Sequence, residues 1–298
     1  MFKRVRRYLN NPYYAFGNDI IKSHPNMMSD KYYLKVLWHQ IMGYELDLNN
    51  PKTFNEKLQW IKLYDRNPLY TKLVDKYLVK QWVAEKIGEE HIIPTIAVYD
   101  SVAEIDLDKL PNQFVLKCNH DSGGVVICKD KSNFDFAKAK NRIQQSFDRN
   151  FYWEYREWPY KNVKRRIIAE QYMKNSDETD LLDYKVFTFD GEPRFIEVDF
   201  DRFTNHTRNL YDIDWHLIDA QIGYPAQKER ICKKPSALAE MLALSRKLAQ
   251  GFKHVRTDFY IINDQIFFGE MTFIHGAGTE MIYPESFGHQ MGDWIKLP

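Results

Sequence analysis

The sequence predicts an α+β protein whose sheets are largely antiparallel. Apolar and β-branched runs of strand length recur from about residue 92 to 271, and two pairs of them flank short turns at Asp190-Gly191 and Asn263-Asp264, as in β-hairpins. Helical periodicity falls between these runs without regular β–α alternation, which argues against a doubly wound parallel sheet. The 298 residues suffice for one large domain or two to three smaller ones.

The N-terminal part of the chain, up to about residue 68, is predicted to be helical. Its apolar side chains recur at helical spacing: Tyr32, Leu34, Leu37, Trp38 and Ile41. Thr53 and Glu56 form a capping-box pattern that starts a further helix, and Pro68 interrupts that helix. A second helix is expected from about 69 to 86.

The remaining elements are predicted from β-branched runs and from apolar periodicity. Strands are expected at 92–99, 114–117, 125–129, 166–172, 184–189, 193–200, 255–262 and 265–271. Helices are expected at 134–150 and 235–250.

Composition excludes several classes of protein. Lys plus Arg is 42 and Asp plus Glu is 41, so the net charge of +1 creates no field that favours nucleic acid. Three cysteines without a CxxC pair disfavour a disulfide framework or a zinc site and favour a reducing cytoplasm. No run of apolar residues is long enough to cross a membrane.

The extreme N-terminus is basic. It carries Lys3, Arg4, Arg6 and Arg7 but no apolar core, so it is not a secretory signal. Two interpretations remain: a solvated helix start, which we prefer, and a segment in weak contact with the anionic surface of an inner membrane.

A polar, glycine-containing loop joins the second and third predicted strands. It follows Lys117 and reads Asn119, His120, Asp121, Ser122, Gly123 and Gly124. Backbone N–H groups of such a loop can fold over phosphates. It is not a P-loop, because it lacks GK[ST] and no helix follows it. A plain hairpin turn explains the glycines equally well, and an isolated Lys117 is more often a surface residue.

The last hairpin carries two acids that suit a metal ion. Pairing its strands about Asn263-Asp264 brings Asp258 near Met271 or Glu270, and strand alternation places Thr272 on the same face as Glu270. Mg²⁺ prefers such oxygen ligands. The alternative is a surface hairpin with solvated acids, but the apolar flanks favour a buried sheet, in which acids need a partner or a metal.

The order of these features resembles the ATP-grasp superfamily over roughly residues 70 to 290. The matching segments are 75–77, 115–117 with its loop, 170–173, 183–185, Arg256-x-Asp258 and 270–272. Segments 51–58, 156–160 and 269–273 resemble more narrowly the TupA-like ATP-grasp family, which is associated with bacterial cell-surface polysaccharide and teichuronopeptide synthesis.

The resemblance implies an ATP-grasp fold, in which two α+β subdomains with mostly antiparallel sheets clasp ATP. A helical region at 1–68 would precede a small subdomain at 69–170 and a large subdomain at 171–298. The 1–68 region departs from the family pattern, because it lacks the βαβ unit that usually comes first. The implied location is the bacterial cytoplasm.

The resemblance also implies the roles of individual residues. Lys76, Lys117 and the loop His120, Asp121, Ser122, Gly123 and Gly124 would bind the phosphates of ATP. Glu170 would meet the adenine amino group, with the backbone of Gln171, Tyr172 and Met173 along the ring. Lys185 would approach the γ-phosphate, Arg256 would stabilise the acyl-phosphate, and Gly276 and Gly278 would donate backbone N–H groups.

Asp258, Glu270 and Thr272 would hold Mg²⁺. Many ATP-grasp enzymes have Asn two residues after the metal-binding Glu, so Thr272 is a departure from the family pattern at a position that concerns the second metal ion. A hydroxyl oxygen can still coordinate Mg²⁺.

The implied activity is ATP-dependent amide formation through an acyl-phosphate. We expect the substrates to be an amino acid and a sugar or uronic acid, with nucleic acid excluded. Candidate carbohydrate contacts are Tyr155, Arg156, Trp158, Arg202 and Arg208, and packing explains each of them about as well. Two alternatives are a glycosyltransferase of the same pathway, using the weak DxD pattern Asp199-Phe200-Asp201, and a non-catalytic carbohydrate-binding module.

Overall fold

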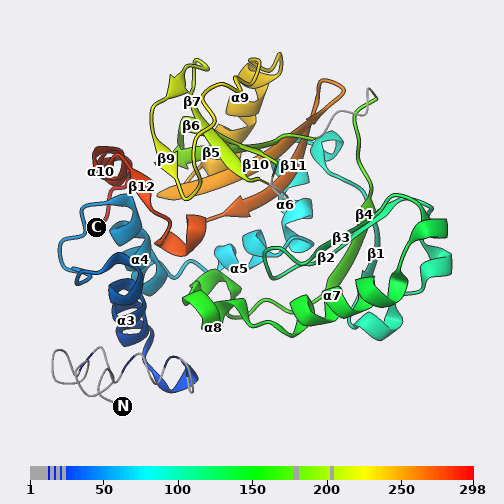
Figure 1. The fold of residues 1–298 in the computed structure, drawn as a ribbon, viewed down its shortest axis with the longest axis horizontal. Helices are drawn as coiled ribbons and strands as arrows, with labels where there is room; N and C mark the ends of the chain where they lie inside the picture. The colour runs from blue at the N-terminus through cyan, green and yellow to red at the C-terminus, as the bar shows by residue number, and fades with distance from the viewer. Residues whose placement is uncertain (1–12, 14–16, 18–20, 22–24, 177–180, 202–204) are drawn as a thin grey trace.

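The fold is built on two antiparallel sheets, seen here in a computed structural model that describes residues 13, 17, 21, 25–176, 181–201 and 205–298. The basic residues at positions 3–7 and Arg202 lie outside the described residues. The predicted α+β class with mostly antiparallel sheets is confirmed. In Figure 1 the larger sheet lies above and to the left of the smaller one.

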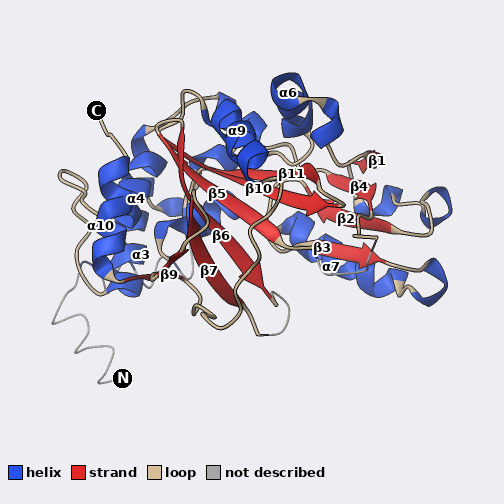
Figure 2. Ribbon diagram, turned by 90° about the horizontal axis from the view of Figure 1, so that it is seen from above, coloured by secondary structure: helices blue, strands red, loops and turns tan. Residues whose placement is uncertain are grey.

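The smaller sheet has the strand order β1-β4-β2-β3, and every neighbouring pair is antiparallel. Its strands are β1 (Thr95–Tyr99), β2 (Phe114–Cys118), β3 (Val125–Cys128) and β4 (Ile167–Gln171). Helix α7 (Phe136–Asp148) packs on it, as Figure 2 shows, and buries Ile143 against Phe114 and Leu116.

The larger sheet has the order β11-β10-β5-β6-β7-β8. Its strands are β5 (Asp183–Phe189), β6 (Glu192–Phe200), β7 (Thr207–Asp212), β8 (Leu217–Ile218), β10 (His254–Ile262) and β11 (Gln265–Thr272). Both predicted hairpins, β5–β6 and β10–β11, are confirmed. A two-stranded sheet, β9 (Gln221–Ile222) with β12 (Ile282–Tyr283), stands beside the larger one.

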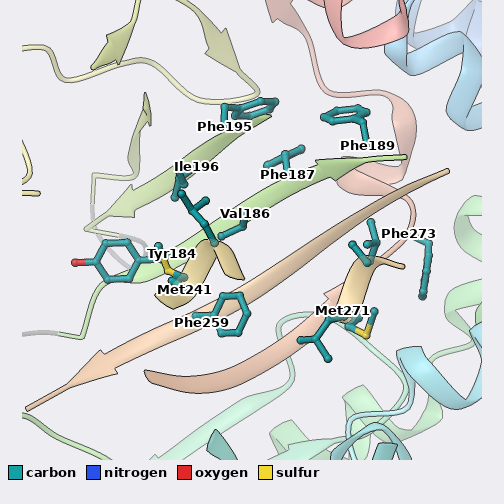
Figure 3. Close-up of a cluster of buried hydrophobic side chains, with 14 of the residues drawn as sticks. Tyr184, Val186, Phe187, Phe189, Phe195, Ile196, Met241, Phe259, Met271 and Phe273 are labelled. Carbon is teal, nitrogen blue, oxygen red and sulfur yellow. The ribbon is translucent and has the colours of Figure 1, made fainter. Parts of the chain in front are cut away.

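One face of the larger sheet is apolar. Helix α9 (Leu238–Ala249) lies across it, and Met241 meets Tyr184, Val186 and Phe259 in the cluster that Figure 3 draws. Ser245 of the same helix hydrogen-bonds to Thr257 at 2.7 Å. The side chains that alternate with these therefore point to the opposite face of the sheet.

The helical N-terminal part contains α3 (Asp30–Met42) and α4 (Phe54–Tyr64). The predicted capping box starts α4, because the Thr53 side chain accepts from the Glu56 N–H and the Glu56 side chain accepts from the Thr53 N–H. Helix α4 packs beside α10 (Glu285–Trp294), on the left of Figure 2, and Phe54 of α4 contacts Phe187 of the larger sheet.

The single helix predicted from 69 to 86 is wrong. The chain instead forms α5 (Leu69–Val74) and α6 (Leu78–Ile87). Asp75 causes the break, because its carboxylate accepts from the N–H groups of Tyr77 and Leu78 and so begins α6. The break turns Lys76 toward the glycine-containing loop, where its N–H donates to Asn119 O at 3.1 Å.

The strand predicted from 92 to 99 starts later, at Thr95, because Pro94 has no N–H to give to a ladder. The remaining elements are α8 (Phe151–Tyr155) and short 3-10 turns. The turns are η1 (Pro25–Met27), η2 (Glu89–His91), η3 (Val102–Glu104), η4 (Leu107–Lys109), η5 (Lys131–Asn133), η6 (Trp158–Tyr160) and η7 (His275–Gly278).

Candidate active site

A row of charged residues crosses the face of the larger sheet opposite α9. Glu270 lies directly opposite Asp258, Asp258 opposite Lys185, and Lys185 opposite Glu197. Directly opposed residues of antiparallel strands project from the same face, so the four side chains are neighbours. We call this surface, together with the residues two positions away on each strand, the charged face.

A β-bulge sets the alignment of the two predicted metal ligands. The β10–β11 ladder pairs Phe259 with Phe268 but Asp258 with Glu270, so Gly269 is the extra residue. A side chain at position 269 would place its Cβ 3.1 Å from Asp258 O, closer than is usual for such contacts. Glycine therefore allows the bulge that brings Glu270 opposite Asp258.

Arg256 binds both acids. Its Nε donates to Asp258 Oδ1 at 2.7 Å, and its Nη2 donates to Asp258 Oδ2 at 2.6 Å and to Glu270 Oε1 at 3.1 Å. Burial raises the pKa of Asp258 and outweighs the opposing charge of Arg256, while Asp183 and Glu270 raise it further. Burial would also raise the pKa of Glu270, but Lys76 and Arg256 lower it to about 2.

The donor set around these acids fits Mg²⁺. Two carboxylates held side by side repel each other and are stabilised by a shared cation, and the hard oxygen donors match this metal. Thr272 lies opposite Arg256, two residues beyond Glu270 and on the same face of β11. The sequence-predicted residues Asp258, Glu270 and Thr272 therefore come together.

His275 and Glu280 extend this network, and no sequence motif pointed to Glu280. Arg256 Nη1 donates to His275 Nδ1 at 2.8 Å, because a guanidinium has no acceptor atom. His275 Nε2 must then carry the hydrogen and donates it to Glu280 Oε2 at 3.0 Å. In this tautomer the His275 imidazole is held by Glu280, and it in turn orients the guanidinium of Arg256.

Lys185 is enclosed by acids. Its Nζ donates to Asp183 Oδ2 at 2.8 Å and to Asp199 Oδ2 at 2.6 Å, and its side chain is 4% exposed. Burial would lower the pKa of Lys185, but Asp183 and Asp199 outweigh it and raise the pKa. Its predicted role at the γ-phosphate would require the ammonium to exchange one of these carboxylates for phosphate.

Arg208 closes the charged face at its far edge. Its Nε donates to Asp199 Oδ1 at 2.7 Å, and its Nη1 donates to Glu280 Oε2 at 3.0 Å. Asp199, the first acid of the DxD pattern, is thus engaged by Arg208 and Lys185. Asp201, the second acid, pairs instead with exposed Arg230 at 2.6 Å. This arrangement does not favour a nucleotide-sugar metal site.

Lys76 joins the glycine-containing loop to the charged face. Its Nζ donates to Asp121 O at 2.5 Å and lies 3.5 Å from Glu270 Oε2. The loop is docked on α7, where Arg149 donates to Ser122 O at 3.2 Å and Arg142 donates to Gly123 O at 3.3 Å. Ser146 Oγ also donates to the Asp121 carboxylate.

Two sequence-predicted nucleotide residues meet on the smaller sheet. Lys117 Nζ lies 2.6 Å from Glu170 Oε2, and Lys80 Nζ, which sequence reasoning missed, lies 2.6 Å from Glu170 Oε1. Burial would raise the pKa of Glu170, but Lys117 and Lys80 lower it. Beyond Glu170 the backbone leaves β4 through exposed Gln171 and half-buried Tyr172 and Met173.

The turn η7 contains Gly276 and Gly278. Its φ angles of 52° at Gly276, 53° at Ala277 and 62° at Gly278 are left-handed. The turn lies beside the site, because His275 at its start contacts Arg256.

His120 of the glycine-containing loop is buried, and burial lowers the pKa of its imidazole.

Three of the candidate carbohydrate contacts, Tyr155, Arg156 and Trp158, are engaged in packing. Arg156 is fully buried, with its guanidinium 4.1 Å from the ring centre of Tyr33, so it packs α3 against α8 and offers no surface. Trp158 stacks under Arg66 at 5.4 Å, and Tyr155 contacts Phe151 at 5.6 Å.

A family model described as TupA-like ATPgrasp matches residues 56–296. Among solved structures, D-alanine–D-alanine ligase from Bacillus anthracis in complex with ATP has 16% identity and a TM-score of 0.44, over 75% of this chain and 63% of that one. The corresponding ligase from Helicobacter pylori has 16% identity and a TM-score of 0.42, over 82% and 69%. D-cycloserine synthetase DcsG has 14% identity and a TM-score of 0.40, over 76% and 72%.

This chain therefore spans less than two thirds of the Bacillus anthracis ligase. A search of curated proteins gives no match. The helices in the part of the chain that the structure describes are too short or too polar to span a bilayer.

Proposed function

The chain belongs to the TupA-like ATP-grasp family, and on that premise we propose that it is an ATP-dependent carboxylate–amine ligase. The observation that carries the proposal is the placement of Arg256 against Asp258 and Glu270 on the charged face, with Lys76 3.5 Å from Glu270. Arg256 thus faces the two acids that are proposed to bind Mg²⁺, and Lys76 connects Glu270 to the glycine-containing loop, whose backbone suits phosphates.

The proposed reaction has two steps. A carboxylate oxygen of the acid substrate attacks the γ-phosphorus of ATP, and ADP leaves with the electrons of the broken P–O bond. An amine then attacks the carbonyl carbon of the acyl-phosphate and loses a proton. Phosphate leaves with the original carboxylate oxygen and takes up that proton as the amide forms. The protein contributes position and charge rather than a nucleophile.

Each group has a proposed part in that chemistry. Lys76, Lys117 and the loop at 120–124 neutralise and cover the phosphates of ATP. Arg256 stabilises the negative charge that develops on the acid substrate and on the tetrahedral species after it. Asp258, Glu270 and Thr272 would hold Mg²⁺, which when bound neutralises the phosphate oxygens.

Lys80 is added to the sequence-predicted nucleotide site. It holds Glu170 together with Lys117, and a carboxylate fixed between two cations presents a defined edge to an adenine amino group. Gln171, Tyr172 and Met173 would supply the adjoining backbone.

We further propose that the amine and the acid are an amino acid and a sugar-derived acid such as a uronic acid. The support is the family's association with cell-surface polysaccharide synthesis. A cytoplasmic site of action belongs to the same proposal.

The test is an assay with Mg²⁺ and ATP against panels of uronic acids and amino acids, scoring ADP and phosphate separately from AMP and pyrophosphate. We expect ADP release that requires an acid and an amine together. Glu270→Gln should lower this turnover at least about a hundredfold, while Glu192→Gln, an exposed acid paired with Arg246, should leave it unchanged. AMP release, or turnover of a nucleotide sugar without ATP, would overturn the proposal.

A further inference from the structure

Helix α4 carries a buried polar face. Asn55, Gln59 and Lys62 are spaced four and three residues apart, so they share one side of the helix. Their exposed fractions are 5%, 1% and 1%. Burying amide and ammonium groups is unfavourable unless each finds a hydrogen-bond partner, so this face must have a specific counterpart.

The counterpart is the segment 275–280, more than two hundred residues away in sequence. Gln59 Nε2 donates to Gly278 O at 2.7 Å and to Ala277 O at 3.2 Å. Lys62 Nζ donates to Ala277 O at 2.7 Å. Asn55 Nδ2 donates to Glu280 O at 2.7 Å. Three side chains of α4 thus hold three backbone carbonyls of this segment, those of Ala277, Gly278 and Glu280.

The turn needs such support. Ala277 has a left-handed φ of 53°, which is unfavourable for a residue with a Cβ and persists only where the surroundings fix it. The fit is also close, because a Cβ at Gly278 would lie 2.5 Å from Gln59 Nε2. The hydrogen bonds from α4 supply the fixing interactions.

The held segment ends at both sides in residues that orient Arg256. His275, at its start, accepts from Arg256 at 2.8 Å, and Glu280, at its end, accepts from His275 at 3.0 Å. Displacing the turn would move both partners of that chain. A change at α4 is therefore expected to reach Arg256 without touching it.

We propose that Asn55, Gln59 and Lys62 are positioning residues that hold the 275–280 segment so that His275 and Glu280 orient Arg256. The catalytic meaning of this positioning rests on the proposed ligase function, whereas the physical coupling does not. The helical N-terminal part would then complete the ATP-grasp site instead of forming a separate substrate module.

Helix α4 offers a matched control for its own packing. Lys57 lies on the same helix, and its Nζ donates to Gly292 O at 2.9 Å and to Ile295 O at 2.8 Å, at the C-terminal end of α10. Lys57→Met therefore removes two part-buried hydrogen bonds of α4 without affecting the 275–280 segment. Gln59→Leu removes two hydrogen bonds to that segment at similar volume and with no change in charge.

The experiment compares Gln59→Leu, Lys57→Met and the unmodified full chain. Backbone hydrogen exchange is measured by mass spectrometry, together with the rate at which phenylglyoxal labels Arg256. Gln59→Leu should accelerate both exchange at 274–281 and labelling of Arg256 about tenfold or more, and Lys57→Met should change neither. Unchanged exchange and labelling in folded Gln59→Leu would overturn the proposal, as would equal effects of the two variants.

Asn55→Ala provides the second variant if Gln59→Leu does not fold, because it removes only the bond to Glu280 O. Lys62 is less suitable, since its loss would remove the larger of the two positive charges, Lys62 and Arg256, that offset the burial of Glu157. With an acid substrate in hand, Gln59→Leu should lower kcat about tenfold or more with an unchanged KM for ATP. Altered exchange and labelling without any ligase activity in the unmodified chain would refute the proposed function and leave the coupling standing.

Discussion

Single side chains of the charged face bind each other in a continuous chain. From Glu270 it runs through Arg256, His275 and Glu280 to Arg208. Burial would raise the pKa of Glu280, but His275 and Arg208 outweigh it and lower the pKa to about 2. Each ion has its partner already in place, so the charges need little reorganisation during a reaction.

His254 provides a prediction about stability and pH. It is 3% exposed, donates from Nδ1 to Thr188 O at 3.0 Å, and lies among Phe54 and Phe189. Burial lowers the pKa of His254 from 6.5 to about 3. Below pH 6.5 the unfolded chain binds a proton at His254 that the folded protein does not bind. The free energy of unfolding therefore falls as the pH is lowered from 6.5 to about 3, by up to ~1.4 kcal/mol per pH unit.

We therefore expect His254→Phe to lose about 1 kcal/mol at pH 8, where only the hydrogen bond is missing, and to be more stable than the unmodified chain at pH 4.5. Denaturant unfolding at both pH values measures the two differences. His289→Gln, at an exposed position on α10, is the control. A free-energy difference between His254→Phe and the unmodified chain that is the same at both pH values would contradict the pKa assignment.

At the scale of elements, the docking of the glycine-containing loop on α7 is testable. A Cβ added at Gly124 would overlap Ser146 Oγ. Gly124→Ala should displace the loop and weaken binding of Mg-ATP about tenfold or more. Ser146→Gly in the same chain should restore most of the affinity, measured by calorimetry. If the double variant binds no better than Gly124→Ala, steric docking on α7 is not the cause.

The sequence predicted those elements that depend on residues close to one another along the chain. The β10–β11 hairpin followed from its two-residue turn and apolar flanks, which brought Asp258 near Met271 or Glu270. The bulge at Gly269, which selects Glu270 as the partner, was not predicted. The break at Asp75 was missed because an Asp carboxylate that caps the following helix looks, in sequence, like one more helical residue. Lys80 was missed for a similar reason, since only the fold brings it to Glu170.

The contacts between α4 and the 275–280 segment could not be predicted from the sequence. Gln59 and Lys62 appear in sequence as ordinary polar positions of an amphipathic helix, and their partners are backbone carbonyls that no residue type reveals. The segment 51–58 resembles the family in sequence, but only the fold shows what Asn55 in it contacts.

At the scale of the whole molecule, the two sheets meet where ATP is proposed to bind. Binding to the folded state alone raises stability by RT ln(1 + [L]/Kd), or about 2.7 kcal/mol at a hundredfold excess over Kd. Mg-ATP should therefore raise Tm, and both Lys117→Met on the smaller sheet and Glu270→Gln on the larger one should reduce the shift. Thermal unfolding with and without Mg-ATP measures this. A shift that either variant leaves intact would exclude its sheet from the nucleotide site.

The most direct measurement of the central claim follows an oxygen atom. The acid substrate is labelled with ¹⁸O in its carboxylate and supplied with Mg-ATP and the amine, and the released phosphate is analysed by mass spectrometry. Attack of the carboxylate on the γ-phosphorus predicts transfer of one ¹⁸O atom into phosphate for each amide formed. Unlabelled phosphate, or label found in AMP, would contradict an acyl-phosphate ligase.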